Sequence, residues 1–147
     1  MAKRIALFAA VGLGVLSMAA ARAEGPDIIT VRQTAFDLNG ASFAYIRSVV
    51  KAKGDVKQLE APGKAIARWA TLIPVMFPAG TEKGGNTKAR SEIWSDSAGF
   101  KKDAGALHDA AIKLTDAAKA GDTTAVADAA EAMGKACGAC HRAYRAK

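Results

Sequence analysis

The sequence predicts an all-α protein, an antiparallel four-helix bundle, and three observations support this prediction. The 147 residues are rich in alanine and poor in β-branched side chains, which favours helices over strands. Four stretches place apolar residues at steps of three and four, so that each stretch has one apolar helical face. Most of the connections between these stretches are short, as in a helical bundle.

The first helix is expected over residues 26–53. Apolar side chains recur there every seven residues and form one stripe, at Ile29, Phe36, Phe43 and Val50. The second helix is expected over residues 56–77, with its own stripe at Ile66, Trp69, Ile73 and Met76. Within it, Pro62-Gly63 is expected to kink the helix or to separate its first turns.

A loop over residues 78–97 precedes the third helix. It is long for a connection between helices and is therefore expected to cover something. The third helix is expected over residues 97–119, ended by Gly121. The fourth begins with Asp122 or Thr123 as its cap, and its apolar stripe includes both cysteines of the chain.

The first 23 residues are typical of a secretory signal peptide. Lys3 and Arg4 give a positive start, residues 5–20 carry no charge, and Ala21-Arg22-Ala23 supplies the small residues before a cleavage site. A permanent membrane anchor is the alternative, but this uncharged stretch is shorter than the roughly 20 residues that span a bilayer. We expect residues 1–23 to be removed on export to the periplasm, leaving residues 24–147 as one domain.

The charge balance is mildly basic. The chain has a net charge of +7, and the leader takes three basic residues and no acidic one with it, which leaves +4. No basic run is interleaved with aromatic residues, as a nucleic-acid surface would require. A charge of this size suits contact with acidic proteins or with the anionic groups of a cofactor.

The segment Cys137-Gly138-Ala139-Cys140-His141 matches C-x-x-C-H, the attachment motif of c-type haem. Two thiols three residues apart can each bond one vinyl group of the porphyrin, and the adjacent histidine can ligate the iron. The sequence therefore predicts one covalent haem c, held by Cys137 and Cys140, with His141 as the metal ligand.

Three other interpretations of the two cysteines are weaker. A structural disulfide is possible in an exported protein. A redox-active C-x-x-C pair is typical of a βαβ unit, and none is predicted here. A zinc site would need four ligands and would use Cys137, Cys140, His141 and His108 together.

A haem motif near the C-terminus of a four-helix chain resembles the cytochrome c′ family, the class II c-type cytochromes. Four further segments carry the same resemblance, which covers nearly the whole mature chain. They are Arg32-Gln33-Thr34-Ala35-Phe36, Phe77-Pro78-Ala79-Gly80-Thr81, Glu92-Ile93-Trp94-Ser95-Asp96 with Phe100, and the tail Cys140-His141-Arg142-Ala143-Tyr144-Arg145.

The resemblance assigns a role to Phe36. In the low-spin branch of the family a methionine at this place ligates the iron, and phenylalanine cannot. The resemblance therefore implies the high-spin branch, with five-coordinate iron beneath an apolar Phe36 that gives no hydrogen bond to dioxygen. Met76, Met133 and His108 are the other possible iron ligands, and each is better explained as a core or surface residue.

The resemblance also places Arg145 beside the proximal histidine and Arg32 at a haem propionate. The alternatives are a cation at the end of a helix for Arg145 and a solvated charge for Arg32. Trp94 is expected to wall the haem pocket or the bundle core.

The function expected from these residues is the binding of small gases such as nitric oxide and carbon monoxide. One-electron exchange with redox partner proteins is a possible second role. The alternative is a low-spin, six-coordinate electron carrier. An enzyme such as a peroxidase is not expected, because the residues near Phe36 offer no base.

Family members commonly form homodimers through their first two helices, and some of the residues Phe43, Ile46, Trp69 and Val75 are expected at such an interface.

Overall fold

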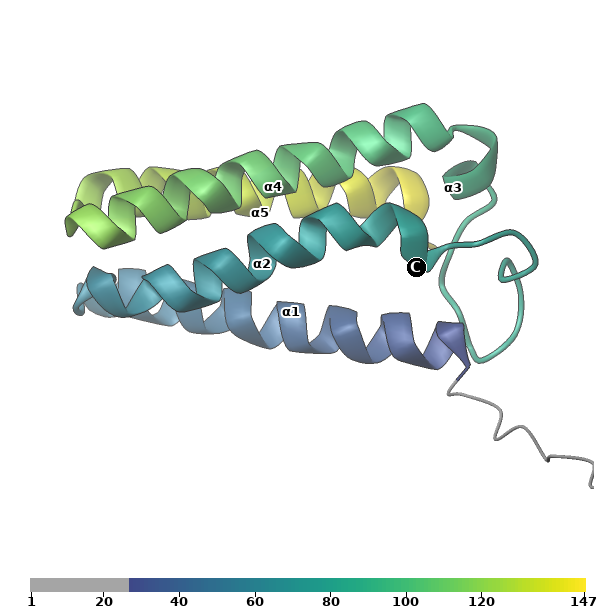
Figure 1. The fold of residues 1–147 in the computed structure, drawn as a ribbon, viewed down its shortest axis with the longest axis horizontal. Coiled ribbons are helices and arrows are strands. Elements are labelled where there is room, and N and C mark those ends of the chain that lie inside the picture. The colour runs from purple at the N-terminus through teal and green to yellow at the C-terminus, as the bar shows by residue number, and fades with distance from the viewer. Residues whose placement is uncertain (1–26) are drawn as a thin grey trace, which may run out of the picture.

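The computed structural model describes residues 27–147, which form four long helices and three short helical elements (Figure 1). In chain order these are α1 (Ile28–Ala52), the 3-10 turn η1 (Val56–Leu59), α2 (Glu60–Leu72), the 3-10 turn η2 (Ile73–Met76), α3 (Glu92–Ser95), α4 (Ser97–Ala120) and α5 (Thr123–Tyr144). The predicted signal peptide, residues 1–23, lies outside the described residues.

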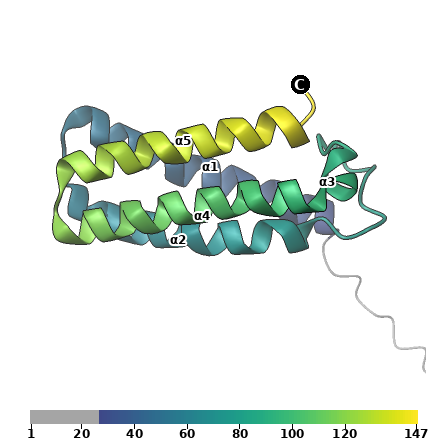
Figure 2. The same ribbon diagram turned by 90° about the horizontal axis from the view of Figure 1, so that it is seen from above.

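The four long helices form an up-and-down bundle, which confirms the predicted fold class. α1 lies beside α2 and α4 lies beside α5, and the view from above shows the two pairs stacked (Figures 1 and 2). α4 packs along α2 and α5 over most of its length, whereas α1 and α5 touch only sparsely. This sparse contact leaves room between α1 and α5. No helix in residues 27–147 is long and apolar enough to cross a membrane.

Aspartates begin three of the long helices. The carboxylates of Asp27, Asp96 and Asp122 accept hydrogen bonds from backbone N–H groups in the first turns of α1, α4 and α5. Such a cap satisfies a donor that has no partner within the helix. Of the two residues considered for the last cap, Asp122 has this role. α4 ends as predicted at Gly121, whose φ of 77° is the left-handed conformation that favours glycine.

The second helix is divided, but not where the sequence suggested. The division falls between Leu59 and Glu60, where η1 passes into α2, and the helix continues through Pro62-Gly63. Pro62 lies in the first turn of α2, where a backbone N–H has no partner to lose, so the proline does not break the helix.

Small residues let α2 and α4 approach closely. Gly63 is buried, and a Cβ atom added to it would lie 2.6 Å from Thr115 Oγ1 and 2.9 Å from Leu114 Cδ2. Farther along, the core is filled by aliphatic side chains and Met133, which is fully buried. Of the four residues considered for a dimer interface, Ile46 is fully buried, Phe43 and Trp69 are half-buried, and only Val75 is strongly exposed.

Candidate functional site

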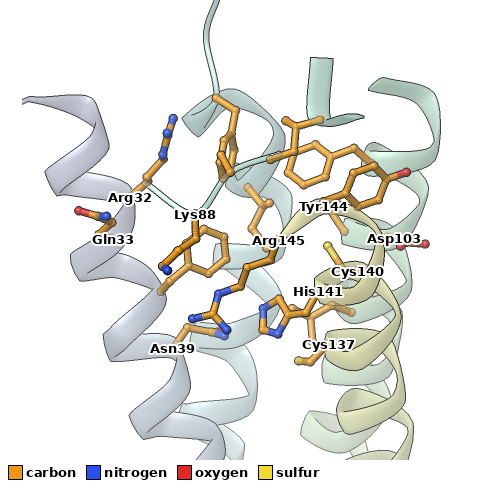
Figure 3. A pocket seen from close by; sticks show the side chains of 18 of the residues that line it. Arg32, Gln33, Asn39, Lys88, Asp103, Cys137, Cys140, His141, Tyr144 and Arg145 are labelled. Atoms are coloured by element: carbon orange, nitrogen blue, oxygen red, sulfur yellow. The ribbon is translucent and has the colours of Figure 1, made fainter. Parts of the chain in front are cut away.

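A cavity of about 590 Å³ opens between α1 and α5, at the end of the bundle that carries α3. Its size falls within the range of about 300–1,000 Å³ that is usual for ligand and cofactor sites. One wall comes from α1 and the facing wall from α5, while residues 86–89 of the long loop line the cavity as well (Figure 3). The loop therefore covers part of this site, as its length predicted.

The α5 wall carries the C-x-x-C-H motif. Cys137, Cys140 and His141 all line the cavity, and both cysteines are free thiols. The thiols are half-buried, because they pack against the edge of the core and also line the cavity. Burial raises the pKa of Cys137, and it raises that of Cys140 to about 11, with smaller contributions from the charges of Asp103 and Cys137. Both sulfurs are therefore protonated at neutral pH in the protein without its cofactor.

His141 lies at the open side of the cavity beside Arg145 (Figure 3). Partial burial of its ring lowers the pKa of His141, and the positive charge of Arg145 lowers it further. Both effects favour the neutral imidazole, which is the form that binds a metal. The structure thus brings Cys137, Cys140, His141 and Arg145 together on one helix end.

Arg145 is held in place by a short strand-like contact. It ends α5 in an extended conformation and pairs with Ala89 of the loop in an antiparallel bridge. Arg90 N–H donates to Tyr144 O, and Ala146 N–H donates to Lys88 O, on either side of that bridge. The long loop is therefore fastened to the chain end that carries Arg145.

Phe36 lies on the α1 wall, half-buried, with its ring edge-on to Trp69 at 5.1 Å and tilted against Phe77 at 6.2 Å. These aromatic neighbours restrict the ring from behind. Phe36 thus belongs to the apolar stripe of α1 and to the cavity wall at once.

Arg32 is the most buried charged residue of the described chain, with 2% of its surface exposed. Its guanidinium lies 4.4 Å from the centre of the Phe77 ring and donates four hydrogen bonds, three to the loop and one to the last residue of η2. The acceptors are Met76 O, Thr81 Oγ1, Thr81 O and Thr87 Oγ1, at 2.7 to 3.4 Å. The alternative of a solvated charge is therefore excluded.

The charge of Arg32 has no carboxylate partner within ion-pair distance among residues 27–147. Burial lowers the pKa of Arg32, and the more distant charges of Asp27 and Glu82 oppose this. Three of its hydrogen bonds hold the loop over the cavity and a fourth holds the end of η2, so one of its five N–H donors is left for another partner.

Trp94 is not among the residues that line the cavity. Its Nε1 donates to Phe77 O at 3.0 Å, and its ring meets the ring of Phe77 at 6.1 Å. Trp94 therefore packs behind Phe77, whereas Phe100 lines the cavity.

The other possible iron ligands stand apart from the cavity. Met133 is fully buried in the core, and neither it nor Met76 lines the site. His108 lies on α4, outside the cavity, with Nδ1 3.1 Å from Asp109 Oδ1. The four side chains of the zinc alternative are thus not brought together.

Polar residues that the haem motif and the apolar stripes do not indicate also lie on the α1 wall. Gln33, Asp37 and Asn39 line the cavity next to Arg32 and Phe36, so this wall is not apolar throughout. The signal was present, because Asn39 follows Phe36 by three residues and Arg32 by seven and therefore shares their helix face. Asp37 is exposed and adds a carboxylate at the open side of the site.

These residues fit a covalently bound haem. Two thiols and an imidazole lie on one wall, a buried cation without an anionic partner lies on the other, and the cavity between them is of cofactor size. The unpaired Arg32 suits an anionic group such as a propionate.

Comparison with known proteins also supports a haem site in this chain. The family model described as Cytochrome C′ matches residues 27–145. Cytochrome c′ of Alcaligenes xylosoxydans xylosoxydans is 38% identical over 127 residues, covering 85% of this chain and 98% of that protein. Cytochrome c′ of Rubrivivax gelatinosus is 35% identical over 124 residues, covering 82% and 95%.

Solved structures agree. The nitric oxide complex of a variant of cytochrome c prime from Alcaligenes xylosoxidans aligns with a TM-score of 0.74 at 38% identity, covering 82% of this chain and 94% of that one. A carbon monoxide-bound variant of the same protein gives the same TM-score and identity. Proteins of this family carry haem c bound covalently through two cysteines, and this chain has only Cys137 and Cys140 to offer. Matched over residues 27–145 and similar to these relatives over most of its length, the chain belongs to the cytochrome c′ family.

Proposed function

We propose that this chain is a periplasmic haem c protein whose five-coordinate iron binds nitric oxide and carbon monoxide, and which can also exchange one electron with redox partner proteins. One observation carries the proposal. Among the described residues that line the cavity, His141 is the only histidine and there is no methionine, while Phe36 faces the site from α1. A sixth ligand of the usual kind is therefore lacking opposite His141.

When bound, haem c supplies an iron atom that can take up a diatomic gas or one electron. The residues of this chain would attach the haem, ligate its iron and position its charged groups. Cys137 and Cys140 would fix the porphyrin to α5, and His141 would give the fifth ligand. Arg145 would place its positive charge beside that histidine. Arg32 would hold the loop and attract a propionate.

The relatives support gas binding. The solved structures of the Alcaligenes xylosoxidans protein include complexes with nitric oxide and with carbon monoxide. Phe36 would leave room for a small gas on the α1 side and exclude a side-chain ligand there. The predicted signal peptide supports export to the periplasm, where c-type haem is attached.

We propose binding and electron exchange rather than enzymatic turnover. Peroxide cleavage would require a base beside the bound ligand. On α1 the only carboxylate near Phe36 that lines the cavity is that of Asp37, and it is exposed.

A homodimer that packs through α1 and α2 is part of the proposal. Large apolar side chains are exposed on these two helices, at Leu38 (66%), Tyr45 (44%) and Leu72 (50%), and on η2, which follows α2 directly, at Val75 (67%). A second copy of the chain would remove them from water.

The visible absorption spectrum of the purified, haem-loaded protein tests the proposal. Five-coordinate high-spin iron gives a broad reduced spectrum without a sharp, split α band, and the spectrum changes when nitric oxide or carbon monoxide is added. A sharp low-spin α band in the reduced protein would contradict the proposal and favour the alternative, a six-coordinate electron carrier. A protein without haem bands would contradict both.

A further inference from the structure

Asn39 carries a buried polar atom that nothing around it satisfies. Its Oδ1 is buried and accepts no hydrogen bond from any residue in the described part of the chain. Buried amide groups in proteins nearly always have a partner, because the loss of water is otherwise not compensated. An unpartnered amide at this place therefore requires an explanation.

The structure gives Asn39 no local role within α1. Asparagine is a poor residue for a helix interior, where its amide is used mainly for caps and turns. Asn39 lies well inside α1, away from both caps, and its side chain forms no hydrogen bond with a described residue. Its side chain instead extends from α1 into the cavity, toward His141 and Arg145 on the facing wall (Figure 3).

Gln33 provides the contrast on the same wall. It also lines the cavity and also bears an amide, but its Nε2 donates to Gly85 O at 3.1 Å and to Asn86 O at 3.3 Å. Gln33 is therefore engaged with the loop, whereas Asn39 faces the space that a cofactor and its ligand would share. The N–H donor of Gln33 is thus bound to the loop, whereas the Asn39 amide has no partner among the described residues.

We propose that the side-chain amide of Asn39 forms a hydrogen bond with the small ligand on the α1 side of the iron; this rests on the proposed function above. Cys137, Cys140 and His141 all belong to α5 and would hold the haem against that wall, so a ligand on the other side of the iron faces α1. Rotation about χ2 lets the amide offer either Nδ2 as a donor or Oδ1 as an acceptor.

This contact changes what the pocket selects. With Phe36 alone, the cover over the iron would be apolar and indifferent to the polarity of the bound gas. The Asn39 amide adds a donor, which favours a ligand in proportion to the negative charge that it carries when bound. Phe36 and Asn39 would together determine which gas the pocket prefers. Phe36 would select by the size of the ligand, and Asn39 by its polarity.

The test is the C–O stretching frequency of the ferrous carbon monoxide complex, compared between the parent protein and Asn39→Leu. A donor lowers this frequency, so the variant is expected to show the stretch at higher frequency, and carbon monoxide is expected to dissociate about 2- to 10-fold faster. Gln33→Leu is the matched control, and its stretch is expected to equal that of the parent. Asn39→Ala serves as a second variant if the leucine hinders haem attachment.

Two outcomes would overturn the inference alone. One is an unchanged stretch in the Asn39 variants, and the other is an equal shift in Gln33→Leu, while carbon monoxide still binds to the parent protein. Failure of the parent to bind carbon monoxide at all would instead overturn the proposed function, and the inference with it.

Discussion

Tyr144 Oη donates a hydrogen bond to Asp96 Oδ2 at 2.7 Å, which joins the last turn of α5 to the N-cap of α4. The other carboxylate oxygen of Asp96 accepts from Gly99 N–H at 3.1 Å and caps α4. The bond to Tyr144 is the main reason that the pKa of Asp96 is lowered, and the bond to Asp96 is the main reason that the pKa of Tyr144 is raised to about 12. One carboxylate thus holds together two helix ends beside the cavity.

Replacing Tyr144 by phenylalanine should weaken this joint. The Tyr144→Phe variant keeps the ring contact with Phe100 and loses only the hydroxyl, so the melting temperature is expected to fall by roughly 5 °C at pH 7. Tyr45→Phe is the control, because Tyr45 is exposed and its bond to Gln58 is less protected from water. An equal fall in the two variants would contradict a special role for the Asp96 bond.

The same pair predicts a dependence on pH. The raised pKa of Tyr144 contributes stability that is complete below pH 10 and is lost as the pH rises toward 12. The lowered pKa of Asp96 contributes stability that is present above its ordinary value of 3.8 and is lost as the pH falls below it. The difference in melting temperature between the parent and Tyr144→Phe should therefore shrink from pH 10 to pH 12, and a constant difference would contradict the assignment.

Arg32 should be essential for the loop over the cavity. Arg32→Met removes four hydrogen bonds and leaves their acceptors without a donor, so the free energy of unfolding is expected to fall by about 2–4 kcal/mol. Urea denaturation measures this loss, and hydrogen exchange should increase in residues 81–87. Arg68→Met, which changes an exposed arginine on α2, should leave both measurements unchanged.

Much of this architecture could be predicted from the sequence, because the decisive patterns are local. The C-x-x-C-H motif, the glycine stop at Gly121 and the aspartate cap at Asp122 depend on neighbours within one or two helical turns. For this reason the structure has the helix end at Gly121 and a cap at Asp122 where the sequence predicts them, and the motif lies in a cavity of cofactor size. The stripe that contains Phe36 is likewise a property of one helix.

What the sequence could not provide depends on contacts between distant segments. Arg32 forms hydrogen bonds with residues that are 44 to 55 positions away in the chain. The sequence alone therefore does not distinguish a buried Arg32 from a solvent-exposed one. The sequence is equally consistent with Trp94 in the pocket wall and in the core. The hydrogen bond from its Nε1 to Phe77 O places it behind Phe77. The spacing of Asn39 places it on the helix face of Phe36, but only the packing of α1 opposite α5 shows that this face lines a cavity.

The close approach of α2 and α4 predicts opposite effects at two glycines. Gly63→Ala would push a methyl group against Thr115 and Leu114, and is expected to destabilise the fold by about 1–3 kcal/mol. Gly105 lies within α4, and a Cβ added there meets no atom within 4 Å. Gly105→Ala is therefore expected to stabilise the protein by about 1 kcal/mol, because alanine favours a helix. Chemical denaturation compares the two, and loss of stability in both would contradict the account of Gly63.

The proposed dimer predicts a selective effect of added charge. Val75→Lys places a cation on η2, beside the exposed apolar side chains of α1 and α2, so the protein is expected to sediment as a monomer. Ile112→Lys makes the same change on α4, where 40% of the side chain is exposed, and should leave the dimer intact. Sedimentation velocity distinguishes the cases, and a parent protein that is itself monomeric would refute the dimer.

A single substitution should convert the proposed five-coordinate iron into a six-coordinate one. Phe36→Met places a flexible thioether on the α1 wall, facing His141 across the cavity, and thioether sulfur is a common axial ligand of haem iron. We expect a sharp, split α band in the reduced variant and at least 10-fold slower binding of carbon monoxide, since the methionine must first be displaced. Phe36→Leu is the control, because it changes the size of the side chain without adding a ligand, and its reduced spectrum should stay broad. A broad spectrum in both variants would mean that position 36 does not lie over the iron.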